Sequence, residues 1–522
     1  MFRGDSRRVP PFTALILLLA GFASATGFAP LGLWPVTIAA FAVLIGVVRR
    51  ATGLKWALLG GWLFGVGHFT LGLNWIAHAF TFQDAMPHWF GYGAVVLLSL
   101  YLAVYPAMAA GLAWRWGRGS DWAYMLFFAA GWIVTEWLRA RMFTGFAWNP
   151  LAATMIDMPV AGWTRLIGTY GVSGLVVLFA GLVGIDLTRH FRGGALRRSA
   201  GLMHSAVLVI ALLLLAAVPA LIDRTPASPG GPVLRVVQPD IGQDTKNDPA
   251  HDNENFRKHA RLSGRPEPEP RLLLWPEAAV PEYLDEDGFA RARLASLLGP
   301  GDLLLTGATK RHRAMTIKDG YYEERTIGGR NSLYAMDAKG NLLHRYDKAH
   351  LVPYGEYLPM RPILSAIGLS RLVPGDIDFW PGPGPQSYAL PGFGRVGVQI
   401  CYEIIFSGQV VDRANRPDFL FNPSNDAWFG SWGPPQHLAQ ARLRAVEEGL
   451  PVIRSTPNGI SAVVDADGRL LESIGHHQAG FIQMRLPPPH APTVFARLGN
   501  LLPLAFALLL AGLGVAFRRR AR

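Results

Sequence analysis

The sequence predicts a protein in two parts, a membrane domain of eight spanning α-helices and an α/β domain outside the bilayer. Long apolar runs fill residues 1–225, and one more run lies near the end of the chain. The residues between them have the composition of a soluble domain. Half of all residues are hydrophobic and only 16% are charged, which is apolar for a soluble protein. We expect an N-terminal membrane domain at 1–225, an α/β domain at 230–488 and a last span at 496–517.

Seven runs before the α/β domain are long enough, or nearly so, to cross a bilayer as a helix, which takes about 20 mostly apolar residues. They lie at about 11–28, 33–48, 56–79, 91–114, 122–138, 170–188 and 202–222. The eighth run, 498–517, contains no charged residue. The layout is therefore seven spans before the α/β domain and one after it.

The first run also resembles a secretory signal peptide. Arg7 and Arg8 precede an apolar stretch, and Ala23-Ser-Ala25 is a small-residue cleavage pattern. Because six further runs follow directly, we favour retention of this segment as the first span. Cleavage would leave the orientation of everything downstream unchanged.

The net charge of +12 is a topology signal, because the basic residues gather in clusters between alternate spans. The clusters are Arg3, Arg7 and Arg8; Arg49, Arg50 and Lys55; Arg115 and Arg118; Arg189, Arg192, Arg197 and Arg198; and Arg518, Arg519, Arg520 and Arg522. If all eight runs span, these clusters share one side, the cytoplasm. Both termini are then cytoplasmic, the α/β domain lies outside the cytoplasm, and a nucleic-acid partner is excluded.

Few ionisable residues fall inside the predicted spans, where such residues are functional candidates by default. They are His68, Asp186, and the pair Glu136 and Arg139, which are three residues apart and can share a helix face. A local ion pair that orients a helix end explains the pair as well as a substrate role does. No chain of carboxylates crosses the bilayer, as a proton-driven transporter would need.

The α/β domain is predicted from short β-rich runs that alternate with turns and helices. The expected strands are 233–237, 271–274, 303–306, 332–336, 396–400, 419–421, 452–454 and 461–464, and the expected helices include 403–411 and 436–449. The stretches 247–270 and 374–385 have the composition of loops.

The only cysteine, Cys401, ends one of these strands and precedes the helical pattern at 403–411. A single cysteine excludes an internal disulfide. A thiol beside a helix N-terminus is favoured as the thiolate. The ordinary alternative is that Cys401 is a small buried apolar residue.

Two other short segments carry chemistry that a thiol nucleophile needs. Glu277 ends a strand beside an aromatic ring, and a buried carboxylate can take the thiol proton. Lys348 can stabilise the oxyanion that forms when the thiol attacks a carbonyl. The three residue types suffice for acyl transfer through a thioester. On sequence alone, Glu277 could equally be an exposed carboxylate and Lys348 a solvated cation, because spacing does not show that they meet.

The ordered set Trp275-Pro-Glu277, Asp347-Lys348 and Cys401-Tyr-Glu403 resembles the nitrilase superfamily, which uses a Glu-Lys-Cys triad on an α-β-β-α sandwich. Longer motifs are similar to one branch of it, the apolipoprotein N-acyltransferase family of bacterial inner membranes. They are EWLR (136–139), TGFAW (144–148), HLVPYGEYLP (350–359), CYEIIF (401–406), NPSNDAWFG (422–430), GPPQH (433–437) and RAVEE (444–448). That family has seven spans before its nitrilase-like domain and one after it.

The resemblance implies Cys401 as nucleophile, Glu277 as general base and Lys348 as oxyanion stabiliser. Glu356 matches a further glutamate that the family requires, and Tyr402 and Glu403 match family residues beside the nucleophile; these three would bind substrate or support the site. No cofactor or metal is implied. One departure is Asn247, which stands at about the place where the family has an aromatic residue.

The implied function is acyl transfer from a phospholipid, with phosphatidylethanolamine as the expected donor, to the N-terminal amine of diacylglyceryl-cysteine in an apolipoprotein. The catalytic domain would be periplasmic, at the inner membrane. Two stretches of this domain, 358–372 and 428–432, are apolar enough to face lipid, or else they pack into the domain core.

Two other functions stay open. A membrane-tethered amidase acting on a small C–N substrate would use the same triad without needing seven preceding spans. A transporter or receptor with a nitrilase-like binding domain would show a broken triad or a polar path through the bilayer.

Overall fold

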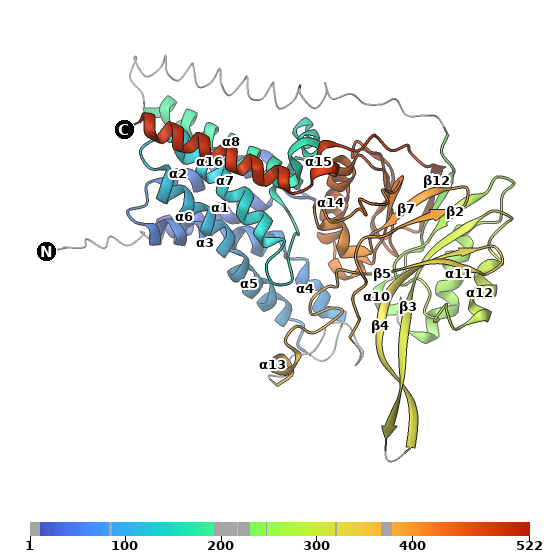
Figure 1. The fold of residues 1–522 in the computed structure, drawn as a ribbon. Helices are drawn as coiled ribbons and strands as arrows, with labels where there is room; N and C mark the ends of the chain where they lie inside the picture. The colour runs from blue at the N-terminus through green and yellow to red at the C-terminus, as the bar shows by residue number, and fades with distance from the viewer. Residues whose placement is uncertain are drawn as a thin grey trace. The chain divides into compact units, whose positions relative to one another are not determined.

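The computed structural model describes residues 11–82, 86–192, 217, 230–246, 248–318, 321–366 and 378–521. These residues form two compact units (Figure 1). The first takes its residues from Met1–Ala77, Gly91–Arg224 and Pro492–Arg522, and the second from His78–Phe90 and Thr225–Ala491. The first unit is therefore built from both ends of the chain.

The first unit is a bundle of apolar helices. They are α1 (Pro11–Ala25), α2 (Trp34–Arg49), α3 (Leu54–Gly72), α5 (Phe90–Leu102), α6 (Val104–Gly117), α7 (Asp121–Arg139), α8 (Thr164–Arg192), α15 (Val494–Leu498) and α16 (Leu501–Arg520). Small residues allow close packing, since a Cβ on Gly67 of α3 would lie 2.2 Å from the carbonyl oxygen of Leu18 in α1.

Three helical segments of the described residues are long and apolar enough to cross a membrane. They are Phe90–Gly117, Pro159–Ile185 and Leu501–Arg520. Leu54–Gly72 with Ile76–Phe82 would be a fourth span, bent by 52°. The predicted run 202–222 lies outside the described residues except for residue 217, so the total of eight spans stays a prediction.

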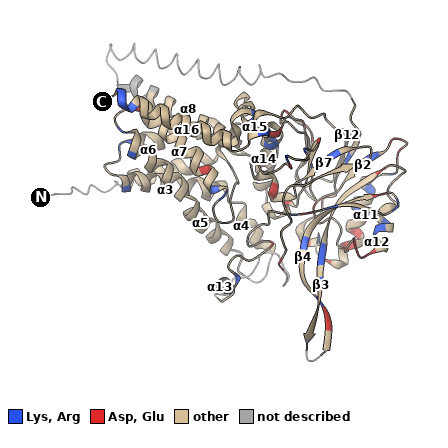
Figure 2. Ribbon diagram, viewed as in Figure 1, with Lys and Arg blue, Asp and Glu red and all other residues tan. Residues whose placement is uncertain are grey.

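Charged residues are sparse in this unit, and basic ones gather at one end of its helices (Figure 2). Arg49 at the end of α2 forms an ion pair with Asp121 at the start of α7. The ring of Trp122 lies 6.2 Å from that of Phe517, which directly precedes three arginines. The basic ends of α2 and α16 thus share one end of the bundle.

Three of the ionisable residues inside the helices, His68, Glu136 and Arg139, have local partners. Glu136 and Arg139 lie 3.8 Å apart on α7, and Arg139 donates to the carbonyl oxygen of Trp148 at 2.7 Å. His68 Nδ1 lies 2.7 Å from the hydroxyl of Ser24. The contacts of Glu136 and Arg139 are those of a local pair that orients a helix end and the loop after it.

The second unit contains two six-stranded sheets. In spatial order the first is β12 (Gly480–Arg485), β1 (Val233–Gln238), β2 (Arg271–Leu274), β3 (Leu303–Lys318), β4 (Tyr321–Asp337) and β5 (Leu342–Asp347). The second is β11 (Leu470–Ile474), β10 (Ser461–Val464), β9 (Val452–Ser455), β8 (Phe419–Pro423), β7 (Gly394–Val398) and β6 (Ser387–Leu390).

Each sheet has a parallel centre and antiparallel edges. β1, β2 and β3 pair in parallel, as do β7, β8 and β9. The central strands β2, β8, β9 and β10 are buried along their whole length, which is typical of sheets covered on both faces. The sheets face each other, and Ser455 Oγ donates to the Val237 carbonyl oxygen at 2.9 Å.

Helices cover the outer faces of the two sheets. α11 (Asp252–Ser263) and α12 (Gly288–Ala295) flank the first sheet, and α14 (Gly433–Glu448) flanks the second (Figure 1). Ala290 and Leu294 of α12 join Leu273 and Leu304 in one apolar core. The unit is a helix–sheet–sheet–helix sandwich of four layers.

Two sequence predictions of local structure are wrong. The stretch 247–270 is not all loop, because its charged segment forms the amphipathic helix α11. The helix expected at 403–411 is a short 3₁₀ turn, Cys401–Ile405, in which the Glu403 carboxylate accepts from the Ile400 N–H at 2.7 Å. That side-chain bond closes the turn locally in place of a longer helix.

Candidate active site

The three predicted catalytic residues come from loops that follow three strands. Glu277 follows β2, Lys348 directly follows β5, and Cys401 comes shortly after β7. All three are buried, with exposed fractions of 6%, 1% and 5%. The carboxyl ends of parallel strands meet at one edge of a sheet, which is where α/β folds place their ligands.

A buried network joins Lys348 to two carboxylates. Lys348 Nζ lies 3.3 Å from Glu277 Oε1 and 3.1 Å from Glu356 Oε1. The amide nitrogen of Asn331 donates to the same two oxygens, at 2.7 and 2.8 Å. The Val352 N–H donates to the other oxygen of Glu356 at 2.8 Å. Glu356 therefore binds Lys348 directly, and the Asn331 amide bridges the two acids.

This network sets the charges of the acid and the lysine. Burial on its own would raise the pKa of Glu277, but Lys348, Lys246 and the Asn331 amide outweigh it and hold that pKa below its usual value. Burial would lower the pKa of Lys348, but Glu277 and Glu356 raise it above its usual range. At neutral pH the site holds an ionised carboxylate and an ammonium side by side.

The thiol of Cys401 is protonated in this site. Burial, followed by the charge of Glu277, raises its pKa to about 12, against the opposing effect of Lys348. The sequence-based expectation of a thiolate favoured by a helix N-terminus is therefore wrong, since only a 3₁₀ turn follows and burial dominates. A protonated thiol beside an ionised carboxylate is an arrangement for general-base catalysis.

Glu403 forms hydrogen bonds with the segment that carries Lys348 and with the segment that carries Cys401. One carboxylate oxygen accepts from the Tyr346 hydroxyl at 2.8 Å and from the Ala349 and His350 N–H groups at 2.8 and 3.1 Å. The other accepts from the Ile400 N–H at 2.7 Å. Glu403 thus joins the residues on either side of Lys348 to the residue before Cys401.

The Tyr402 side chain lies in an aromatic group. Its ring is 5.2 Å from Phe406 and 5.8 Å from His350, and the residue is 4% exposed. These contacts are those of a packing residue beside Cys401.

Lys246 belongs to the site, although the sequence did not single it out. Its ammonium donates to the Glu277 carbonyl oxygen at 2.8 Å, and burial lowers its pKa to about 8. The sequence did contain a signal for this residue, because Lys246 comes after strand β1 in the same way that Glu277 comes after strand β2. Asn247, the predicted departure from the family pattern, lies outside the described residues.

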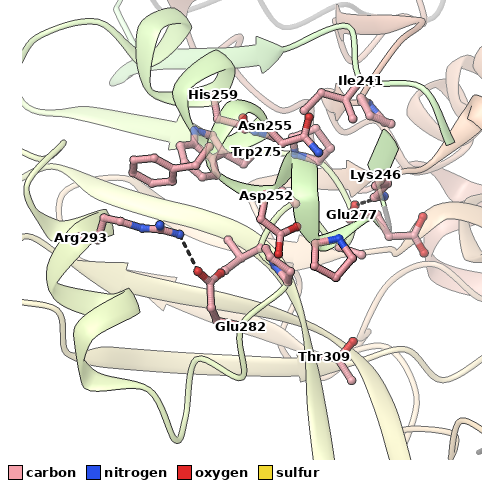
Figure 3. Close-up of a pocket in the computed structure, with 18 residues that line it drawn as sticks. Ile241, Lys246, Asp252, Asn255, His259, Trp275, Glu277, Glu282, Arg293 and Thr309 are labelled. Carbon is pink, nitrogen blue, oxygen red and sulfur yellow. Dashed lines mark hydrogen bonds and ion pairs between the residues drawn. The ribbon is translucent and has the colours of Figure 1, made fainter. Parts of the chain in front are cut away.

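A cavity of about 250 Å³ lies beside Glu277 and Lys246 (Figure 3). His259 and Asn255 of α11 also line it, and His259 Nε2 and Asn255 Oδ1 have no hydrogen-bond partner among the described residues. Ligand pockets usually measure roughly 300–1,000 Å³. The size and polarity of this cavity suit a small polar group or water more than an acyl chain.

Further residues around Cys401 were also missed by the sequence analysis. Asn422, Asp426 and His437 lie in motifs used for the family resemblance, but nothing in those motifs assigned a role to them. His437 Nε2 lies 3.1 Å from the Cys401 carbonyl oxygen, and the Asn422 amide donates to it at 3.3 Å.

Comparison with known proteins places the whole chain in one family. The family model described as the apolipoprotein N-acyltransferase N-terminal domain matches residues 20–182, and the carbon-nitrogen hydrolase model matches residues 234–490. An amidase of the nitrilase superfamily from Nesterenkonia sp. AN1 overlaps 54% of this chain and 98% of its own, with 17% identity and a TM-score of 0.35.

Two relatives named apolipoprotein N-acyltransferase match almost from end to end. The protein from Rhodopseudomonas palustris is 35% identical over 528 residues, which covers 97% of this chain and 95% of the relative. The protein from Bradyrhizobium diazoefficiens is 36% identical over 523 residues, with the same coverage. This chain belongs to the apolipoprotein N-acyltransferase family.

Proposed function

We propose that this acyltransferase moves an acyl chain from a phospholipid to the N-terminal amine of diacylglyceryl-cysteine in an apolipoprotein, through a thioester on Cys401. The observation that carries the proposal is the meeting of Glu277, Lys348 and Cys401 in one buried site, in a chain that matches named N-acyltransferases over nearly its full length.

In the first half-reaction Glu277 takes the thiol proton as the sulfur of Cys401 attacks the ester carbonyl carbon. Lys348 stabilises the oxyanion that forms. When the C–O bond breaks, the proton passes from Glu277 to the departing oxygen of the lysophospholipid. The acyl group is then a thioester on Cys401, and Glu277 is again a carboxylate.

In the second half-reaction the neutral amine of the lipoprotein attacks the thioester carbon. Glu277 accepts a proton from the amine, and the C–S bond breaks. The sulfur leaves with that proton, so that the thiol is restored and an amide has formed. The ionised state of Glu277 and the high pKa of the thiol suit both transfers.

The other predicted site residues have supporting roles in this scheme. Glu356 holds the ammonium of Lys348 in place, and Glu403 fixes the loops of Lys348 and Cys401 to each other. Tyr402 packs beside the nucleophile.

We propose the membrane arrangement that the sequence predicts: eight spans in a bacterial inner membrane, both termini in the cytoplasm and the catalytic domain in the periplasm. The gathering of basic residues at one end of the helical unit supports this orientation. Phosphatidylethanolamine remains the expected donor, because of the family resemblance.

The apolar stretches predicted to face lipid differ from each other. In the described part of 358–372, Met360 and Ile363 are each 63% exposed, which supports a lipid-facing role. Trp428 instead packs edge-on against Phe82 at 5.4 Å, within the catalytic unit. We therefore assign the lipid contact to the first stretch.

Mass spectrometry of the purified chain incubated with phosphatidylethanolamine tests the function. We expect an acyl adduct on Cys401 that disappears when a diacylglyceryl peptide is added, with the acyl group recovered on the amine of the peptide. No adduct, together with release of ammonia from simple amides, would favour the amidase. An intact but unreactive thiol would favour a binding role.

A further inference from the structure

A buried polar cluster lies behind Cys401, on the second sheet. Asn422 is in β8, Asp426 follows that strand, His437 is in α14 and Arg454 is in β9. All four side chains have no exposed surface. Buried polar side chains of this kind persist only where their hydrogen bonds are made, so the partners of the cluster show what it holds.

Two side chains of the cluster form hydrogen bonds with the backbone carbonyl oxygen of Cys401. His437 Nε2 lies 3.1 Å from this oxygen and the Asn422 amide 3.3 Å from it. A carbonyl oxygen only accepts, so the proton of the imidazole sits on Nε2 and is donated to Cys401. Two donors from two different elements therefore converge on one oxygen of the nucleophile.

Arg454 holds both donors, because it donates to the Asn422 side-chain oxygen and to the unprotonated Nδ1 of His437. Asp426 in turn binds Arg454. His437 Nδ1 lies 3.0 Å from both Asp426 and Arg454. The planar fork of one guanidinium thus orients both donors, as its fixed geometry allows.

The backbone of Cys401 needs these hydrogen bonds because its conformation is strained. Cys401 has a φ of +52°, in the left-handed region that residues with a Cβ seldom adopt. The peptide group is planar, so fixing the carbonyl also fixes the direction of the next N–H. A conformation of this kind persists only where its surroundings impose it.

We propose that His437 and Asn422, oriented by Asp426 and Arg454, are positioning residues that hold the Cys401 backbone so that its thiol faces Glu277 and Lys348. They touch neither the lipid nor the reacting atoms. The proposal rests on the proposed function only in taking Cys401 as the nucleophile.

The test compares His437→Leu, which lacks the donor, with His437→Gln, which can place an amide N–H near the same oxygen. In the full-length protein, the rate of acyl adduct formation on Cys401 is expected to fall about 10- to 100-fold in the leucine variant. The lipid concentration for half-saturation and the shape of the pH profile should stay unchanged. The glutamine variant should recover most of the rate.

Wild-type rates in His437→Leu would overturn the proposal. So would equal losses in both variants accompanied by a changed pH profile, which would indicate an acid–base role. If the leucine variant does not fold, Asn422→Ser serves instead; it removes the amide that donates to the Cys401 and Gln399 carbonyl oxygens and accepts from Arg454. It should show a smaller loss with the same unchanged profile, and a wild-type rate there would count against the proposal.

A second readout needs no lipid and so separates this proposal from the proposed function. Labelling of Cys401 by a small thiol reagent should respond to Glu277→Gln when His437 is intact, because the charge of Glu277 acts on the thiol. The response should vanish in the His437→Leu background. An unchanged response would show that the thiol orientation does not depend on His437.

Discussion

Replacing Glu277 by glutamine separates the two effects of this carboxylate on Cys401. Its charge raises the pKa of the thiol, after the larger effect of burial. As the proposed general base, it also removes the thiol proton during attack. Glu277→Gln takes away both effects while keeping nearly the same shape. We expect a thiol that ionises more readily and an enzyme that acylates much more slowly.

The size of the second effect follows from the thiol pKa. With a pKa of about 12, roughly one thiol in 10⁵ is ionised at pH 7, and forming that thiolate costs about 7 kcal/mol. A base that takes the proton during attack avoids the separate ionisation, and such a base contributes about 10²–10⁴-fold in rate. We expect a loss of that size in the rate of acyl adduct formation.

Two measurements on the same samples check this reasoning. Intact-mass kinetics with phospholipid give the acylation rate, and labelling with a small thiol reagent between pH 7 and 10 reports the thiolate. Labelling should be faster in Glu277→Gln than in the wild type at each pH, with Cys401→Ala as the unlabelled control. Wild-type acylation within about threefold in Glu277→Gln would refute the general-base role. Slower labelling would refute the electrostatic part.

Other substitutions test the buried network. Lys348→Met leaves two buried carboxylates without their cation, which should cost about 3–5 kcal/mol and lower the Tm by roughly 6–20 °C, whereas the exposed Lys339→Met should not. Lys246 has a folded-state pKa of about 8, below its usual 10.5, so its charge opposes folding at pH 7 and this cost fades as pH rises through that interval. Lys246→Met should therefore raise the Tm at pH 7 by about 2–4 °C and slow acylation. Glu403→Gln sets an amide against backbone donors and should cost about 1–3 kcal/mol in thermal unfolding. In the wild type, Glu277 stays ionised and the thiol stays protonated from pH 6 to 9, but Lys246 loses its charge near pH 8, so acylation should slow as the pH rises through 8.

Hydropathy and short strand patterns predicted much of the fold. Every expected strand overlaps an observed one, because the central strands are continuous apolar runs. The four edge strands β5, β6, β11 and β12 were missed, since their residues are largely exposed or half-buried. The helix α11 was missed because its sequence is mostly charged and amide residues, with an apolar face only a few residues wide.

The site was predictable only where a residue type itself signals chemistry. Glu277, Lys348 and Cys401 could be named from family motifs, and their convergence depends on the order of strands in two sheets, which local sequence does not encode. Asn331 could not be found, because an asparagine inside a long strand looks like any polar edge residue. Its role becomes visible only when two carboxylates lie within 2.8 Å of its amide.

The burial that makes Cys401 a poor thiolate also suits it to carry an acyl group. A thioester can be consumed by water or by an amine, and exclusion of water suppresses the loss to hydrolysis. Cys401, Glu277 and Lys348, the proposed catalytic residues, are each at most 6% exposed, so bulk water would have little access to a thioester on Cys401. A permanently ionised thiol would bring no advantage in such a site, because the thiol needs to lose its proton only when an ester carbonyl is in place. In the proposed mechanism, the high thiol pKa, the ionised Glu277 and the buried Lys348 act together. They would keep the sulfur unreactive until a lipid enters the site, and the burial of the site would protect the thioester until an amine arrives.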